Sequence, residues 1–226
     1  MDDYTIHVNL SINKVGDRNV SVIKERIWRP LVSYHTHLLK KITMPKFLFD
    51  GLGLTLITTS AIIAEGVIAD IIDEHCLNTG ITPEWGTGLE RATWRDKKDK
   101  YNSLFTKQLE SYIGYDAIDI LFRFRNNVAH GLAHLEKSSI QEVTNQKSDL
   151  ESVNVNYQLI RKFFIDRRVM QPTDTSSNTN HLWQFKNASH LWFEAKSFIT
   201  NVLKDNESSF IDSIRSEWET ATSGKG

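Results

Sequence analysis

The stretch FRFRNNVAHGLAH at residues 122–134 contains two arginines, two asparagines and two histidines in a setting that is otherwise apolar and helix-like. An arginine fork binds phosphate oxygens through paired hydrogen bonds and stays charged at any relevant pH. A histidine titrates near neutrality, so it can take or give a proton. Arg125 and His130 therefore suit the cleavage of a phosphodiester, and Asn126 can orient either group or the ribose. With RNA, the 2′-hydroxyl is an internal nucleophile, so this chemistry requires no metal.

The five-residue separation of Arg125 and His130 limits how the two side chains can meet. On one straight helix they would point about 140° apart. Asn126 and Asn127 are poor helix-interior residues, which favours a helix that begins or kinks at this point. Two alternatives remain: the arginine side chain swings round, or a second copy of the helix supplies the partner group. An interhelical hydrogen-bond network without catalysis is a further interpretation of the same residues.

Composition narrows the class of protein. The 226-residue chain has 27 basic and 28 acidic residues, which argues against a strongly basic protein that coats nucleic acid. The single cysteine, Cys76, excludes an intramolecular disulfide, and its apolar surroundings predict a core position. Glu65 and Asp70 interrupt the apolar stretch 52–72, so a buried helix is favoured over a membrane span. Because the first residues carry no apolar signal-peptide block either, we expect a cytoplasmic protein with no membrane partner.

Apolar residues at helical spacing predict a mainly α-helical chain. Pro30 fits the first turn of the first helix, and Gly80 suits the C-terminal cap of a long apolar second helix. Asn187 or Ser189 is expected to cap the last long helix. The predicted helices cover residues 30–42, 54–77, 89–112, 116–134, 191–203 and 210–218.

Two short segments alternate between apolar and polar residues with period two. Residues 4–12 predict a half-buried strand, followed by a turn at 15–19 and by a second strand or a helix start at 20–23. An amphipathic arm without fixed structure is the alternative for this segment. The alternation at 153–157 is brief and leaves a further strand open, and the polar composition of 172–180 predicts a linker.

Further charged residues are candidates to support the 122–134 stretch. An unpaired carboxylate is costly within an apolar helix, so Glu65 is expected to hold Arg125 or Arg123 in place, with exposure to solvent or to an interface as the alternative. The basic and aromatic segment 157–168 suits RNA through phosphate neutralisation and base stacking, although an amphipathic surface helix has the same composition. The basic run 91–100 also contains aspartates and is interpreted as a solvated helix face. The candidate supporting residues are Glu65, Arg123, Asn127, His134, Arg161, Arg167 and Arg168.

The histidines of the stretch raise the question of a metal. His130 and His134 are four residues apart and share a helix face, as metal ligands often do. The sequence HGLAH lacks the glutamate of the metalloprotease motif and offers no third ligand, so we expect neither a metal nor another cofactor. His134 is expected at the rim of the site, in contact with RNA or with solvent.

The segment RNNVAHG at residues 125–131 resembles the signature of HEPN domains: an arginine, a polar residue and, a few positions later, a histidine, late in an all-helical domain. As in the HEPN bundle, a long apolar helix with an internal acid, Glu65, precedes the motif, and a terminal helix follows. The resemblance spans residues 48–204. It implies a mainly α, HEPN-like helical bundle, to which this chain adds a short β-containing N-terminal segment and a polar insertion before the last helices.

This fold class divides the chain into three expected parts. Residues 1–45 form an N-terminal extension with strand and helix, and residues 46–205 form the HEPN-like bundle, with the insertion at 138–187. Residues 206–226 form a C-terminal helix and a disordered tail. The N-terminal segment and the insertion are departures from the minimal bundle, and they leave the RNA target and the partner open.

The resemblance also implies an activity. Many HEPN proteins are metal-independent endoribonucleases that act as homodimers, with two motif copies facing each other in one composite site and products that end in a 2′,3′-cyclic phosphate. Arg125 would stabilise the phosphate, His130 would transfer protons, and Asn126 would occupy the polar position of the motif. The implied setting is a toxin or anti-phage defence effector with an antitoxin or other regulatory partner. The alternative is a non-catalytic HEPN-like module that binds a nucleotide, RNA or a protein.

Overall fold

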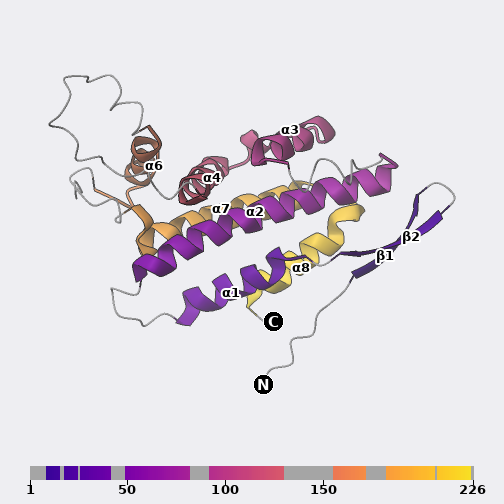
Figure 1. The fold of residues 1–226 in the computed structure, drawn as a ribbon, viewed down its shortest axis with the longest axis horizontal. Coiled ribbons are helices and arrows are strands. Elements are labelled where there is room, and N and C mark those ends of the chain that lie inside the picture. The colour runs from indigo at the N-terminus through magenta and orange to yellow at the C-terminus, as the bar shows by residue number, and fades with distance from the viewer. Residues whose placement is uncertain are drawn as a thin grey trace.

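The structure is a computed structural model that describes residues 9–15, 18–24, 26–41, 49–81, 92–129, 155–171, 182–206 and 208–224. The described chain is mainly α-helical, as the sequence predicted. Its helices form three layers, and a pair of long helices makes the middle layer (Figure 1). The central pair is α2 (Phe49–Thr79) and α7 (Phe185–Asp205), which lie side by side. One outer layer holds α1 (Trp28–Lys41) and α8 (Asp212–Ser223); the other holds α3 (Trp94–Leu104), α4 (Tyr115–Ala129) and α6 (Val155–Asp166).

The helix α2 occupies the centre because it is apolar on almost every side, as a helix surrounded by neighbours must be. It contacts α1, α3, α4, α7 and α8, and Ile57, Ile63 and Ile68 along it are fully buried. Gly80 follows its last residue with a φ of 71°, which only glycine adopts without strain. By length and composition, Leu52–Thr79 would also qualify as a membrane span. A core helix of a soluble protein passes the same test, and half of this apolar window is buried inside the chain.

The helix predicted for residues 89–112 is shorter than expected at both ends. Thr93 is its N-cap, because the Thr93 hydroxyl accepts from the backbone N–H of Asp96 and the Asp96 carboxylate accepts from that of Thr93. This reciprocal capping box starts α3 at Trp94. The helix ends at Leu104, and a short 3-10 turn, η2 (Leu109–Ser111), then leads to Gly114. The φ of Gly114 is 90°, a left-handed conformation that suits glycine, and this residue separates η2 from α4.

Two other local predictions are wrong. Residues 153–157 were expected to allow a short strand, but the helix α6 begins within this segment, at Val155. Ile160 and Phe164, one turn apart, bury one face of this helix, and the short alternation before them does not reveal that face. Neither Asn187 nor Ser189 caps α7, which starts at Phe185 after Gln184. Both residues lie within the helix, in its first turn or beyond it, and the Ser189 hydroxyl donates to the backbone carbonyl of Phe185 at 2.7 Å. The linker predicted at 172–180 lies outside the described residues.

The N-terminal segment contains a β-hairpin. Strand β1 (Asn9–Val15) pairs antiparallel with β2 (Arg18–Lys24), in a register that sets Asn9 opposite Lys24 and Val15 opposite Arg18. The hairpin precedes α1 in the chain (Figure 1). Residues 4–8 of the predicted strand lie outside the described part of the chain.

The described helices share one hydrophobic core. Trp28 from α1, Trp192 from α7 and Trp218 from α8 are buried together. The distance between ring centroids is 6.0 Å for Trp28 and Trp218 and 6.4 Å for Trp192 and Trp218. Cys76 is buried, as predicted, and burial raises the pKa of its thiol. The helices α1 and α8 therefore pack against each other and against the central pair, and they share its core. The predicted division of the chain after residues 45 and 205 stays a prediction.

Candidate functional site

The helix α4 carries the first half of the candidate motif. It runs from Tyr115 through Arg125 and both asparagines to Ala129, so no helix begins at the asparagines. The backbone of Asn127 is helical, and the placement of its side chain, of His130 and of His134 lies outside what the structure describes. How Arg125 and His130 lie relative to each other therefore stays a prediction, and the described part of the candidate site consists of Arg125 and its neighbours.

The side chain of Arg125 is fixed by three contacts. Its Nη1 donates to Oε2 of Glu65 on α2, its guanidinium lies 4.6 Å from the centre of the Phe122 ring, and its Nη2 lies 3.5 Å from Oδ1 of Asn126. The predicted contact between Glu65 and Arg125 is therefore present. Arg123 does not share it, because Arg123 donates at 2.7 Å to Asp119 one turn earlier on α4.

Helix geometry explains why the two arginines differ. Ala117, Ile118, Leu121 and Phe124 are fully buried on the face of α4 that packs against the bundle. Arg125 follows this face at its edge, so that its long side chain reaches back to α2, and 27% of the side chain remains exposed. A charged group at such an edge keeps part of its hydration while it forms a fixed ion pair.

A second cation binds the same carboxylate. Lys97 on α3 donates from Nζ to Oε1 of Glu65 at 2.7 Å, and only 10% of its side chain is exposed. This corrects the interpretation of the run 91–100 as a solvated face, which holds for Arg95, at 87% exposed, but not for Lys97. A signal for Lys97 exists in the sequence, because it lies three residues after Trp94 and four before Tyr101, and both aromatic residues are buried on one helix face.

Aromatic rings connect Arg125 on α4 with α3, the helix that carries Lys97. Trp94 on α3 stacks on Phe122 of α4 with 4.3 Å between ring centroids and an interplanar angle of 11°. Arg125 covers Phe122 in turn. The resulting layer of Trp94, Phe122 and Arg125 joins α3 to α4. The cation–π contact with Phe122 also restricts the rotation of the Arg125 guanidinium. Glu65 on α2 binds both cations and so joins α3 and α4 to α2.

The remaining predicted basic residues occupy other places. Arg167 bridges Glu194, at 2.6 Å from its Nε, and Asp116, and covers the ring of Phe163 at 3.9 Å. Burial opposes the charge of Arg167, but its hydrogen bonds to the two carboxylates outweigh burial and raise its pKa. Its charge is thus already used to join the segment after α6 to α4 and α7.

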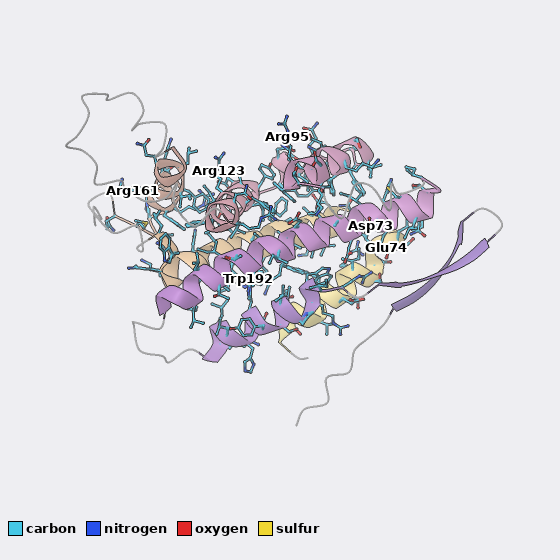
Figure 2. All side chains as sticks on the ribbon, viewed as in Figure 1. Asp73, Glu74, Arg95, Arg123, Arg161 and Trp192 are labelled. Atoms are coloured by element: carbon cyan, nitrogen blue, oxygen red, sulfur yellow. The ribbon has the colours of Figure 1, made fainter. Side chains whose placement is uncertain are left out.

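Other arginines face outward. Figure 2 shows Arg161, Arg123 and Arg95 along one edge of the molecule, on α6, α4 and α3 respectively. Arg168 is exposed next to Arg167, with a φ of 57°, a left-handed conformation that a non-glycine residue adopts at some cost. The structure therefore brings Arg125 and Lys97 together at Glu65. Arg161 lies on α6, and Arg167 and Arg168 directly follow its last residue. Among the residues described, no group of three His, Cys, Asp or Glu side chains could hold a metal ion.

Comparison of the chain with protein-family models, with curated proteins and with solved structures gives no match. The likeness to HEPN domains consequently rests on the motif at residues 125–131 and on its helical setting.

Proposed function

We propose that this chain is a metal-independent endoribonuclease of the HEPN type that cleaves RNA at a composite site made by two copies of the chain. The observation that carries the proposal is the fixed, partly exposed guanidinium of Arg125, held by Glu65 on a helical scaffold just before a histidine. Held groups stabilise developing charge better than mobile ones, because they need no reorganisation during the reaction.

The guanidinium retains donors for a phosphate. It has five N–H groups, of which Glu65 takes one from Nη1 and Asn126 lies near another on Nη2. The others can bind the non-bridging oxygens of a phosphodiester. In the proposed reaction the 2′-oxygen attacks phosphorus and the bond to the 5′-oxygen breaks. His130 side chains take the proton from the 2′-hydroxyl and deliver one to the 5′-oxygen, which leaves a 2′,3′-cyclic phosphate and a 5′-hydroxyl.

The course of α4 supports the proposed two-copy arrangement. Because the helix continues through Arg125 to Ala129, a histidine on the same straight helix would point about 140° away from Arg125. A facing second copy supplies the missing group without distortion of either helix. We further propose a cytoplasmic protein that acts as a toxin or anti-phage effector under the control of an antitoxin or another regulatory protein, with no metal or other cofactor.

One observation favours a second candidate function. Arg125 is already paired with Glu65 in the free chain, an arrangement that also stabilises the contact between α2 and α4. A HEPN-like module that binds a nucleotide, RNA or a protein without cleavage would use the same residues. The two candidates differ in one respect only, which is whether a bond in the bound RNA breaks.

The end groups of the products test the proposal. Purified full-length chain is incubated with a 3′-labelled and a 5′-labelled RNA in excess EDTA, and the fragments are analysed by mass spectrometry. We expect 2′,3′-cyclic phosphate ends from the unaltered chain and no fragments from His130→Ala. Intact RNA with the unaltered chain, together with retained RNA binding, would support the non-catalytic module instead. Fragments that disappear when EDTA is added would contradict a metal-independent mechanism.

A further inference from the structure

The ion-pair cluster of Glu65, Lys97 and Arg125 contains more positive than negative charge. Both oxygens of Glu65 are used, Oε1 by Lys97 and Oε2 by Arg125. Within the described parts of the chain, neither cation pairs with a second carboxylate. Two cations and one carboxylate give the cluster a net charge of +1 at neutral pH.

This surplus charge lies where it is costly. The exposed fractions of the side chains are 10% for Lys97, 18% for Glu65 and 27% for Arg125, and aromatic rings border the cluster. A partly desolvated charge without a counter-charge is unfavourable, and its electric field is stronger there than in water. An anion that reaches the exposed side of the cluster would therefore gain more than it would from the same charge on an open surface.

We infer that this cluster binds one phosphate group of the RNA, with Arg125 as the contacting residue, Lys97 as a second positive charge behind it, and Glu65 as an internal anion that competes with the phosphate. The identity of the ligand as RNA rests on the proposed function. The position of the surplus charge follows from the ion pairs themselves. Arg125 makes the contact because it is the most exposed of the three.

The arrangement gives Lys97 and Glu65 opposite effects on RNA affinity. Replacing Lys97 by methionine keeps the length of the side chain and lowers the cluster charge to zero, whereas Glu65→Gln keeps the shape and raises the charge to +2. The double variant returns the charge to +1 with Arg125 retained. A purely structural role predicts another pattern, in which each single variant weakens binding through loss of order.

Binding is measured with a 2′-O-methyl oligonucleotide, which cannot be cleaved through its 2′-oxygen, by fluorescence anisotropy over a series of salt concentrations. We expect Lys97→Met to weaken binding and Glu65→Gln to tighten it, each by about tenfold or more, because a unit charge within roughly 12 Å of the phosphate has at least this effect at an effective dielectric constant near 20. The slope of log Kd against log salt should change by about 0.7 in opposite directions, the contribution of one phosphate contact in a single strand. The double variant should bind like the unaltered chain.

Arg95→Gln is the matched control, since it removes one positive charge from the same helix at an exposed position. It should change affinity less than Lys97→Met does. Thermal unfolding identifies any variant that fails to fold, and in that event the double variant, which removes both members of the Lys97–Glu65 pair, carries the comparison with the unaltered chain. Weaker or unchanged binding by folded Glu65→Gln, or a double variant that differs from the unaltered chain as much as Lys97→Met does, would overturn the inference.

The failure of this inference differs from the failure of the proposed function. Opposite shifts in affinity without any RNA cleavage would leave the phosphate site in place and remove the ribonuclease. Cleavage of RNA without opposite shifts would retain the ribonuclease and remove the role assigned here to Lys97 and Glu65.

Discussion

Trp28 on α1 donates a hydrogen bond of 2.7 Å from its indole Nε1 to Oδ2 of Asp70 on α2. Arg26 lies 3.5 Å from the same carboxylate oxygen and donates at 2.6 Å to Glu217 on α8. The side chains of Arg26 and Asp70 are almost fully buried. This polar contact therefore joins α1, α2 and α8 through charged hydrogen bonds inside the bundle. Figure 2 labels Asp73 and Glu74, which lie on the same helix as Asp70.

Removal of the indole donor should destabilise the bundle. Trp28→Phe keeps an aromatic ring and removes the hydrogen bond to a buried carboxylate, which costs about 2 kcal/mol beyond the loss of packing. Urea unfolding measures the change. Trp94→Phe is the control, since Trp94 stacks on Phe122 and its Nε1 forms no hydrogen bond among the described residues. Equal losses of stability in the two variants would show that the bond to Asp70 contributes nothing.

The buried His35 should make stability depend on pH. Its Nε2 lies 2.5 Å from Oγ1 of Thr59, whose hydroxyl already donates to the carbonyl of Thr55 at 2.7 Å. Nε2 is therefore the protonated nitrogen and donates to Thr59. Among the described residues the buried Nδ1 has no hydrogen-bond partner, and the imidazole packs edge-on against Trp192 with 4.6 Å between the ring centroids. Burial disfavours the charged form and lowers the pKa of His35 from 6.5 to about 4.

The direction of this pH dependence follows from proton uptake by the unfolded chain. Between pH 6.5 and 4 the unfolded state binds the proton at His35 and the folded state does not, so stability is fully present above pH 6.5 and falls toward pH 4. The full loss is about 3 kcal/mol. His35→Gln retains a donor for Thr59 and does not titrate, so the difference in unfolding free energy between it and the unaltered chain isolates this effect from carboxylates. A difference that stays constant from pH 7 to pH 4.5 would refute it.

Gly53, in the second turn of α2, should resist replacement. Alanine normally stabilises a helix interior by about 1 kcal/mol relative to glycine. A Cβ at Gly53, however, would lie 1.9 Å from the backbone oxygen of Trp183, where the segment before α7 crosses α2. Gly53→Ala should therefore cost about 3 kcal/mol or more, because the backbone must move. Gly80→Ala has a positive φ but open space around it and should cost about 1–2 kcal/mol. The reverse order in thermal unfolding would contradict the close approach.

The parts of the fold that the sequence predicted are those fixed by local patterns. The long apolar repeat of α2, the glycine that follows it at position 80, and the pairing of Glu65 with a motif arginine all follow from rules that need only a few neighbouring residues or one costly buried charge. The start of α3 was also readable, since Thr93 and Asp96 have capping-box spacing, but with an aspartate in place of the usual glutamate.

The parts that could not be predicted depend on contacts between distant segments. Lys97 resembles its exposed neighbours in the basic run, and only the approach of Glu65 from α2, 32 positions away, gives it a buried partner. Arg167 looks like a residue free to bind RNA until Asp116 and Glu194 surround it. The alternation at 153–157 is too short to distinguish a strand from the first turn of a helix whose buried face lies further on.

The central claim is that Arg125 acts on a phosphodiester without a metal, and the most direct test is the rate of RNA cleavage in excess EDTA by Arg125→Ala and Arg123→Ala. The two arginines lie two residues apart on α4, but Arg123 pairs with Asp119 and not with Glu65. We predict cleavage by the unaltered chain and by Arg123→Ala, with a loss on the order of 100-fold or more for Arg125→Ala, as expected when a fixed donor to the transition state is removed. Equal cleavage by both folded variants would contradict the claim.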